Sequence, residues 1–355
     1  MAQRVCAARP VAPALLRTLR GHSDTVRALS VSQDGAVLYS GSWDGTVRAW
    51  RAGDGEELYA LPAQGGAVLA VAQSADGELL FAGTESGDVR VWQGAKTRVL
   101  RAHVGPVRAL ATARREFDGT APSDSPLYSA GDDGVIRAWT GAGHAQPQRR
   151  AELSAQQQPA GAAPPALWCL ALSRDGEALY AGGEDGSIAV WQPRALAQAG
   201  CLRAHAGAVR ALALSRDDAS LFSAGEDRLI RRWSPGSGQV VAVLRGHNFC
   251  ILALALSRDG RTLYSGSWDH TLRVWGVEAG ECVHVAGAEG APGGSSDPVW
   301  AVALAPDSTE LHSAASDCHV RTWRVAASPW AACAPKCGVR GGWAMLLQNL
   351  TGQPR

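Results

Sequence analysis

Serine, histidine and aspartate recur together in this sequence at fixed spacing, and these are the residues that many hydrolases use for nucleophilic catalysis. In four segments, a histidine is followed by a serine, an aspartate and a tryptophan at matching offsets. The four sets are His22/Ser40/Asp44/Trp50, His103/Ser129/Asp133/Trp139, His205/Ser223/Asp227/Trp233 and His247/Ser265/Asp269/Trp275. A hydrolase needs one exposed nucleophile beside an oxyanion site. Four copies of the same set do not fit that requirement.

A structural hydrogen-bond network explains the four sets better. An indole N–H can only donate, so a buried tryptophan needs an acceptor, and serine and histidine can relay that bond to an aspartate at a turn. We therefore expect each set to fix a loop to a sheet, and we expect no catalytic residue. Replacing Asp44 or Asp269 with alanine should leave a buried histidine underpaired and cost roughly 1–3 kcal/mol of stability.

Other patterns that carry chemistry are scarce. No glycine-rich phosphate loop followed by Lys-Ser/Thr is present, and no HExxH or paired CxxC motif occurs. Cys333 and Cys337 form a single C-x₃-C without two further clustered ligands. The eight cysteines are scattered, which favours a reducing compartment. We predict no enzyme activity, no metal and no cofactor.

A repeat of roughly forty to fifty residues must position these side chains. Its clearest mark is a tryptophan at positions 50, 92, 139, 191, 233, 275 and 323. Before each tryptophan come two alternating runs, an Asp-Gly or similar turn and a third run, and a fourth run follows it. Each unit therefore predicts four short strands. One such sheet cannot bury both faces, but radial stacking lets each sheet cover its neighbours.

The units resemble WD40 repeats, most clearly GHSDTVRALSVSQDGAVLYSGSWDGTVRAW (21–50) and GHNFCILALALSRDGRTLYSGSWDHTLRVW (246–275). The resemblance covers about residues 14–326 and implies an all-β, seven-bladed β-propeller of four-stranded antiparallel blades. It also implies that LLRTLR (15–20) supplies the outer strand of the last blade. We expect an N-terminal tail over 1–14, the propeller over 15–326 and a C-terminal extension over 327–355, partly ordered or disordered.

Three units depart from the pattern. Unit two has Gln64, Ala82 and Ser86 in place of the histidine, serine and aspartate; unit four has Ala163, Ala181 and Asp185; and unit seven has Ser295, Ser313 and Asp317. Insertions at 156–166 and 286–298 are rich in Gly, Pro, Ala and Ser, which predicts flexible loops, and a third insertion at 113–126 lies between the first and second strands, on the opposite face. An arginine stands two residues before six of the closing tryptophans, and we expect each to pack its stem and keep its charged end in water.

The resemblance also implies a binding surface. We name the face that carries the Gly-His segments and the Asp turns the His-Asp face. Its two interaction positions in each blade are the second residue of the first strand and the residue before the turn Asp. From blade one to blade seven, the first position reads Arg27, Leu69, Arg108, Trp168, Arg210, Leu252, Trp300 and the second reads Trp43, Glu85, Asp132, Glu184, Glu226, Trp268, Ser316.

Tryptophan and arginine are enriched at binding hot spots. Trp268, Trp300 and Trp43 come from blades six, seven and one, which are neighbours in a closed ring. We therefore expect a protein or peptide segment with an apolar anchor over these three residues. Its basic group would face the acidic positions, namely Glu85, Asp132, Glu184 and Glu226. The alternatives are tryptophans that only pack on neighbouring turns, and an aromatic cage for methylated lysine.

Composition narrows the class of partner. Lys plus Arg (34) nearly equals Asp plus Glu (33), so the net charge is too small to attract nucleic acid or an anionic membrane by long-range electrostatics. No run of eighteen apolar residues and no signal peptide are visible. We predict a monomeric scaffold or adaptor inside the cell, cytoplasmic or nuclear. The first residues carry arginine and no acid before Asp24, which also fits a transit peptide, but the fold needs residues 15–20.

The rival function is a substrate-recognition subunit of a ubiquitin ligase complex, a role that many propellers fill. Two features count against it. Fourteen residues before the first predicted strand leave no room for an F-box helix bundle, and no closing tryptophan is followed by the Asp-x-Arg that looks typical of cullin-adaptor docking. A G-protein β-subunit is disfavoured because no heptad helix precedes the ring.

Overall fold

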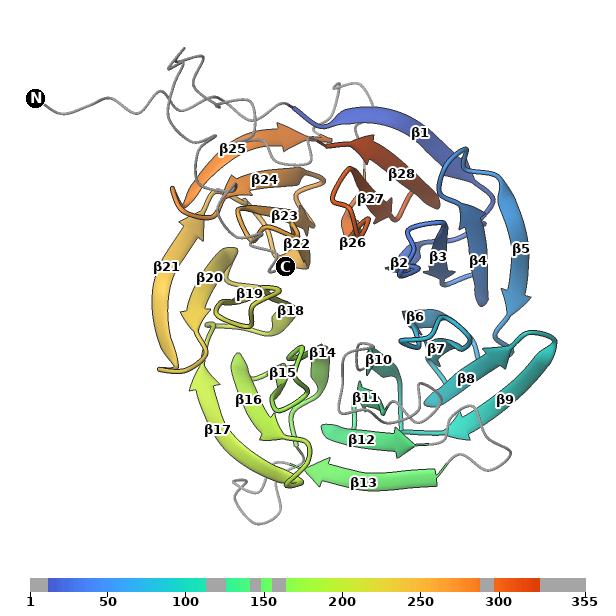
Figure 1. The fold of residues 1–355 in the computed structure, drawn as a ribbon, viewed down its shortest axis with the longest axis horizontal. Helices are drawn as coiled ribbons and strands as arrows, with labels where there is room; N and C mark the ends of the chain where they lie inside the picture. Colours follow the sequence, from blue (N-terminus) through green and yellow to red (C-terminus); the bar gives the residue numbers. More distant parts are fainter. Residues whose placement is uncertain (1–11, 113–125, 141–147, 155–163, 288–296, 326–355) are drawn as a thin grey trace, which may run out of the picture.

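The structure, a computed structural model, describes residues 12–112, 126–140, 148–154, 164–287 and 297–325. These residues form 28 strands in seven four-stranded antiparallel sheets, arranged as blades around a central axis (Figure 1). They contain no helix, so none long and apolar enough to cross a membrane. The all-β, seven-bladed prediction is confirmed. The predicted C-terminal extension and most of the three predicted insertions lie outside the described residues.

Each blade runs from an innermost to an outermost strand. Blade one is β2 (Val26–Val31), β3 (Val37–Ser42), β4 (Thr46–Arg51) and β5 (Glu57–Pro62); blade two is β6 (Val68–Gln73), β7 (Leu80–Thr84), β8 (Asp88–Gln93) and β9 (Lys96–Arg101); blade three is β10 (Val107–Thr112), β11 (Leu127–Gly131), β12 (Val135–Thr140) and β13 (Gln148–Ser154); blade four is β14 (Leu167–Leu172), β15 (Leu179–Gly183), β16 (Ser187–Gln192) and β17 (Ala197–Arg203); blade five is β18 (Val209–Leu214), β19 (Leu221–Gly225), β20 (Leu229–Ser234) and β21 (Gln239–Arg245); blade six is β22 (Ile251–Leu256), β23 (Thr262–Ser267), β24 (Leu272–Gly276) and β25 (Glu281–Ala286).

Blade seven joins the two ends of the ring. Its strands β26 (Val299–Leu304), β27 (Glu310–Ala315) and β28 (His319–Arg324) pair with β1 (Ala14–Arg20). In Figure 1 the blue β1 lies along the outside of the red-brown β28. Leu15 lies opposite Trp323 and Leu19 opposite Val320, with a register shift between Leu15 and Arg17. The N-terminal strand therefore closes the ring by pairing, as predicted.

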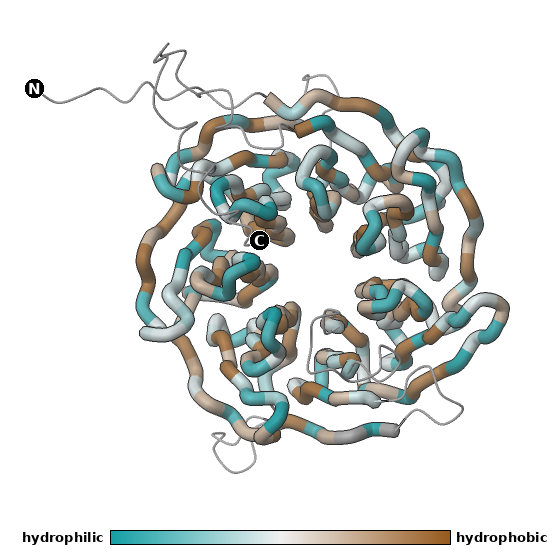
Figure 2. Tube along the Cα trace, viewed as in Figure 1, coloured by the Kyte–Doolittle hydropathy of each residue, from teal (hydrophilic) through white to brown (hydrophobic). Residues whose placement is uncertain are grey.

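The cores lie between blades. The second strand of each blade is buried almost throughout, because the flanking blades cover both of its faces. The closing tryptophan packs on the preceding blade: Trp50 joins Val320 and Ala314 of blade seven. The outermost strands are more exposed than the second strands, and β21 (QVVAVLR) is largely exposed although most of its residues are apolar and are coloured brown in Figure 2. Stacking the blades therefore buries what a single sheet would expose.

Candidate binding face

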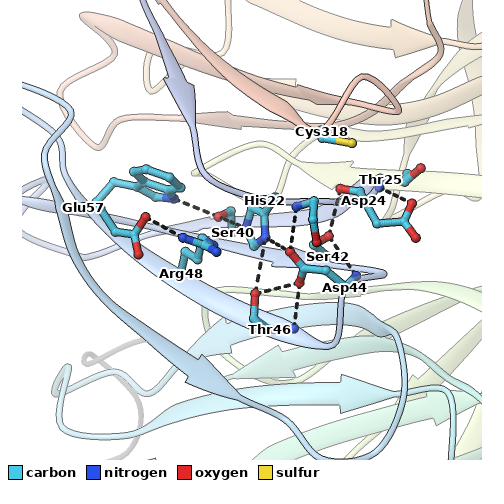
Figure 3. A network of polar contacts seen from close by, with 12 residues as sticks. His22, Asp24, Thr25, Ser40, Ser42, Asp44, Thr46, Arg48, Glu57 and Cys318 are labelled. Carbon is cyan, nitrogen blue, oxygen red and sulfur yellow. Dashed lines mark hydrogen bonds and ion pairs between the residues drawn. The ribbon is translucent and has the colours of Figure 1, made fainter.

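The predicted His/Ser/Asp/Trp sets form continuous hydrogen-bonded chains in the structure. In blade one, the Trp50 indole N–H donates to Ser40 Oγ (2.8 Å), and Ser40 Oγ lies 2.7 Å from His22 Nε2. His22 Nδ1 lies 2.7 Å from Asp44 Oδ2 (Figure 3). Every group is satisfied by a neutral histidine that donates from Nδ1 and accepts at Nε2. The chain thus links the segment before β2 to the β3–β4 turn.

The other three sets repeat this geometry in blades three, five and six. Each tryptophan donates its indole N–H to the serine of the second strand, and these pairs are Trp139 with Ser129 (3.0 Å), Trp233 with Ser223 (2.8 Å) and Trp275 with Ser265 (2.8 Å). The serine-to-histidine distances are 2.6–2.8 Å, and the histidine-to-aspartate distances are 2.8 Å. All four complete sets therefore share one hydrogen-bonding pattern.

The serines and closing tryptophans of these sets lie in the interior of the propeller. Ser129, Ser223 and Ser265 have no exposed surface, as is also true of Ser40. Trp233 is only 4% exposed. This burial agrees with the structural role expected of these residues, because neighbouring blades cover the second strand on both faces and neither a substrate nor a partner can reach them. They contribute to the fold and do not form part of an accessible site.

The four His/Ser/Asp/Trp sets do not form a metal site in the described residues. No group of three or more metal-ligating side chains occurs among the described residues. The histidines and aspartates of the four sets are instead paired with each other and with the buried serines. The sets therefore act as hydrogen-bonded links between loop and sheet.

Burial and hydrogen bonding set the charges in these chains. Burial lowers the pKa of His22 and His247 below the ordinary histidine value, although the partner aspartates act in the opposite direction. Burial raises the pKa of Asp269, but hydrogen bonds from His247 and Thr271 outweigh it and hold that pKa well below its usual range. The neutral histidine beside an ionised aspartate is the favoured state at neutral pH.

One of the arginines before the closing tryptophans, Arg137, is more buried than expected. Arg137 Nη1 donates to Asp133 (2.6 Å) and its Nη2 to Glu152 (2.8 Å), and the residue is 7% exposed. Arg231 binds Asp227 in the same way (2.6 Å). For Arg137 the expectation that the charged end stays in water was wrong, because the turn aspartate and the outer strand both provide carboxylates within reach.

The degraded units leave visible gaps in the network. In blade four, the buried Trp191 indole N–H has no partner among the described residues, because Ala181 replaces the serine. Within the part of the chain that the structure describes, Asp185 accepts hydrogen bonds only from Ser187, two residues away. In blade seven, Trp323 still donates to Ser313 (2.9 Å). The residues at positions 163 and 295 lie outside the described residues.

On the His-Asp face, the two interaction positions of one blade form hydrogen bonds with each other in blades three, five and seven. Arg108 binds Asp132 through two hydrogen bonds (2.7 and 2.8 Å). Arg210 binds Glu226, with Nε 3.1 Å from the carboxylate. Trp300 donates its indole N–H to Ser316 (2.7 Å). Sequence reasoning treated the two positions separately and missed these pairs, although writing them blade by blade would have revealed opposite charges side by side.

Aromatic residues gather where blades six, seven and one meet. The Trp268 and Trp300 rings lie edge to face with centroids 5.1 Å apart. The Arg27 guanidinium lies 3.7 Å from the Trp300 ring centroid and 5.8 Å from that of Trp43. Trp43 and Trp268 are 45% and 44% exposed. The structure therefore brings the three predicted tryptophans together.

Phe249 is 60% exposed in the segment that precedes β22, between His247 and that strand. It extends the aromatic surface on blade six and was missed by sequence reasoning. The only available signal was an apolar residue within an otherwise polar loop sequence, Gly-His-Asn-Phe.

Trp168 lies on another part of the same face, between two arginines. Its ring centroid is 4.4 Å from the Arg108 guanidinium and 3.7 Å from that of Arg210. Since both arginines also hold their own carboxylates, this side of the face is internally paired. Trp168, Trp300 and the three arginines line an axial opening of about 240 Å³. Glu85 and Glu184 are exposed and have no ion pair among the described residues.

Comparison with known families decides the class of repeat. The family described as "WD domain, G-beta repeat" matches residues 13–51, 55–93, 161–192, 197–234, 238–276 and 281–324. The chain belongs to the WD40 family. The family match passes over the third blade, yet β10–β13 form a WD40 blade with an intact His103 chain. WD40 repeats serve in general as protein-interaction scaffolds, and their propeller is typically non-enzymatic.

Three curated relatives match short stretches of the chain. WD repeat-containing protein pop1 of Schizosaccharomyces pombe is 43% identical over 56 residues, which is 16% of this chain and 7% of pop1. WD repeat-containing protein pop2 of the same yeast is 47% identical over 49 residues (14% and 7%). Small ribosomal subunit protein RACK1 of Medicago sativa is 43% identical over 49 residues (14% and 15%). The aligned part is thus a small fraction of each relative.

Proposed function

We propose that this WD40 propeller is a non-enzymatic scaffold or adaptor that binds a protein or peptide segment on its His-Asp face. The observation that carries the proposal is the aromatic surface of Trp43, Trp268 and Trp300 around Arg27. Exposing a cluster of large aromatic side chains is costly without a partner, and tryptophan and arginine dominate measured hot spots.

The exposed tryptophans stand on anchored turns, which further supports binding. Trp43 and Trp268 directly precede Asp44 and Asp269, and each aspartate is held by a buried histidine. A side chain carried by a fixed turn loses little conformational freedom on association. Blades one and six therefore present their aromatic groups in a preorganised arrangement.

The acidic positions refine the expected partner. Asp132 and Glu226 are engaged by the chain's own arginines, so a basic group of a partner would compete with existing ion pairs there. We place that basic group over Glu85 and Glu184 instead. The face of Trp300 is occupied by Arg27, which disfavours the methyl-lysine cage because a ligand cation would need the same position.

Affinity capture of the full chain from cells, read by mass spectrometry, tests the proposal. The double variant Trp43→Ala/Trp268→Ala should lose the principal partners. Tyr59→Ala is the matched control, because Tyr59 is equally exposed (45%) but lies on the outer strand β5. Partners retained by a folded double variant would contradict binding on the His-Asp face.

The same experiment addresses the rival role in a ubiquitin ligase complex. That role predicts ligase subunits among the captured proteins, retained by the double variant because they would dock away from the substrate face. We place the scaffold inside the cell, in the cytoplasm or nucleus, as a monomeric propeller. In support, all cysteines of the described residues are free.

A further inference from the structure

The three arginines at the axial opening are not equivalent. Arg108 and Arg210 each hold a carboxylate from their own blade. Arg27 occupies the same position in blade one, but the residue at the acidic position there is Trp43. No carboxylate of the described residues lies within ion-pair distance of Arg27. Three arginines therefore line the opening, and two of them are paired with a carboxylate of their own blade.

The surroundings of Arg27 do not compensate its charge fully. The side chain is half-buried against Trp300, and it lines the opening together with Arg108 and Arg210. Burial, followed by the charges of those two arginines, lowers the pKa of Arg27. The guanidinium remains protonated at neutral pH. Contact with an aromatic ring is a weaker form of compensation than an ion pair with a carboxylate.

We infer that the bound segment places one Asp or Glu side chain over the opening, where its carboxylate pairs with Arg27 beside Trp300. This inference rests on the proposed function and specifies the chemistry of its ligand. One excess positive charge matches one carboxylate. A phosphate group, which carries close to two negative charges at neutral pH, would exceed that excess. The exposed Glu85 and Glu184 also disfavour a second acidic group on the rim.

The side chains around Arg27 predict the order of residue types along the bound segment. Trp268 and Phe249 on blade six offer apolar contact on one side of Arg27. Glu85 and Glu184 on blades two and four offer contact for basic residues on the other. A segment that crosses the face should therefore read apolar, acidic and then basic, in either chain direction.

A random-peptide display selection on the full chain provides the probe. We expect the selected peptides to share an Asp or Glu next to an apolar residue. The selection could yield peptides that lose binding to the Trp43→Ala/Trp268→Ala variant but share no acidic residue. That result would overturn the inference and leave the proposed function intact. A selection that yields no peptide sensitive to those substitutions would count against both.

The ion pair itself is tested by measuring affinities of the best peptide and its acid-to-amide counterpart. The amide peptide should bind about tenfold to a hundredfold more weakly to the wild type. The Arg27→Met variant should bind both peptides equally, at the weaker level. Arg258→Met, at the opposite end of the innermost strands, is the matched control and should behave as the wild type. An acid preference that persists in Arg27→Met would refute the pair.

A third peptide, with phosphoserine in place of the acidic residue, tests the charge argument. It should bind no more tightly than the carboxylate peptide. Tighter binding of the phosphopeptide would overturn the assignment of a single carboxylate. Circular dichroism and the thermal midpoint of Arg27→Met and Arg27→Gln verify that weaker binding does not reflect unfolding, and the amide peptide needs no change in the protein.

Discussion

Blades six and seven are neighbours in the ring, but they are held together differently. Blade six is built from four consecutive strands and carries a complete chain from Trp275 through Ser265 to Asp269. Blade seven takes β1 from the other end of the propeller. Its turn residue Asp317 is bound by Arg321 and by His319, two residues further along the chain.

The cores of the two blades differ at two matching positions. Tyr264 of β23 corresponds to His312 of β27, which is 1% exposed and contacts Thr322 (3.0 Å). Ala286 of β25 corresponds to Leu19 of β1, and both are buried. The joining blade thus has a polar residue inside and a larger apolar residue on its outer strand. Blade six relies more on its polar network, whereas blade seven relies more on burial of the closing strand.

The largest test of this difference is Leu19→Ala. It gives blade seven the alanine that blade six has at this position, but it leaves a cavity against Val26, Trp50 and Val320. We expect a loss of about 2–5 kcal/mol in the free energy of unfolding, measured by urea denaturation. Leu16→Ala, in the irregular part of β1, should cost less. Equal losses would show that β1 contributes without a specific anchor.

The second test is the pH dependence of His312. Burial lowers its pKa to about 4, and the charge of Arg17 acts in the same direction. A folded-state pKa below the unfolded value means that stability is complete above about pH 6.5 and is lost as pH falls towards 4. His312→Tyr, the residue of blade six, should remove roughly 2–3 kcal/mol of this loss between pH 7.5 and 4.5.

Unfolding curves at the two pH values measure this effect. His312→Gln is the control, because it removes the titrating group without adding an aromatic ring. Both variants should show a flatter pH profile than the wild type. A wild-type slope retained in both would exclude His312 as its source.

The third test removes the network of blade six. Asp269→Ala should cost roughly 1–3 kcal/mol, since buried His247 loses its carboxylate. Asp185→Ala is the matched change in blade four, where the aspartate has only a local partner, and it should cost less. Thermal midpoints of the two variants make the comparison. Similar shifts would mean that the hydrogen bonds linking Asp269 to His247, Ser265 and Trp275 add no stability beyond that of the turn itself.

The smallest test concerns the exposed rings. Trp268→Ala should change stability by less than about 1 kcal/mol, because the ring is largely at the surface. Trp300→Ala of blade seven should cost more, since that ring is half-buried and its N–H is bonded to Ser316. Denaturation curves should rank them in this order. The reverse ranking would mean that the Trp268 ring contributes to the stability of the fold through packing.

The repeat made the blade count predictable, and the resemblance to WD40 repeats implied the ring closure. Periodic tryptophans and alternating runs reflect local strand pairing, which short-range sequence encodes well. The third blade shows that this reasoning can exceed a family match, because Trp139, Ser129 and His103 keep their order and contacts around a long insertion.

Details of the site were less accessible from sequence. The position of Arg27 over Trp300 depends on how the innermost strands of neighbouring blades converge at the axis. Such contacts join residues that are distant in sequence. Burial of Arg137 was also missed, since its carboxylate partner Glu152 lies on the next strand.

The pairing of β1 with β28 has a consequence for synthesis of the chain. The ribosome releases β1 before the other strands of the propeller, and the three other strands of its sheet come last. Leu19 therefore stays unpaired with Val320 while six blades are synthesised. Blades one to six can assemble during translation, because each is complete once its fourth strand has appeared. The nascent protein therefore carries an open edge and an unburied N-terminal strand until translation has passed residue 324.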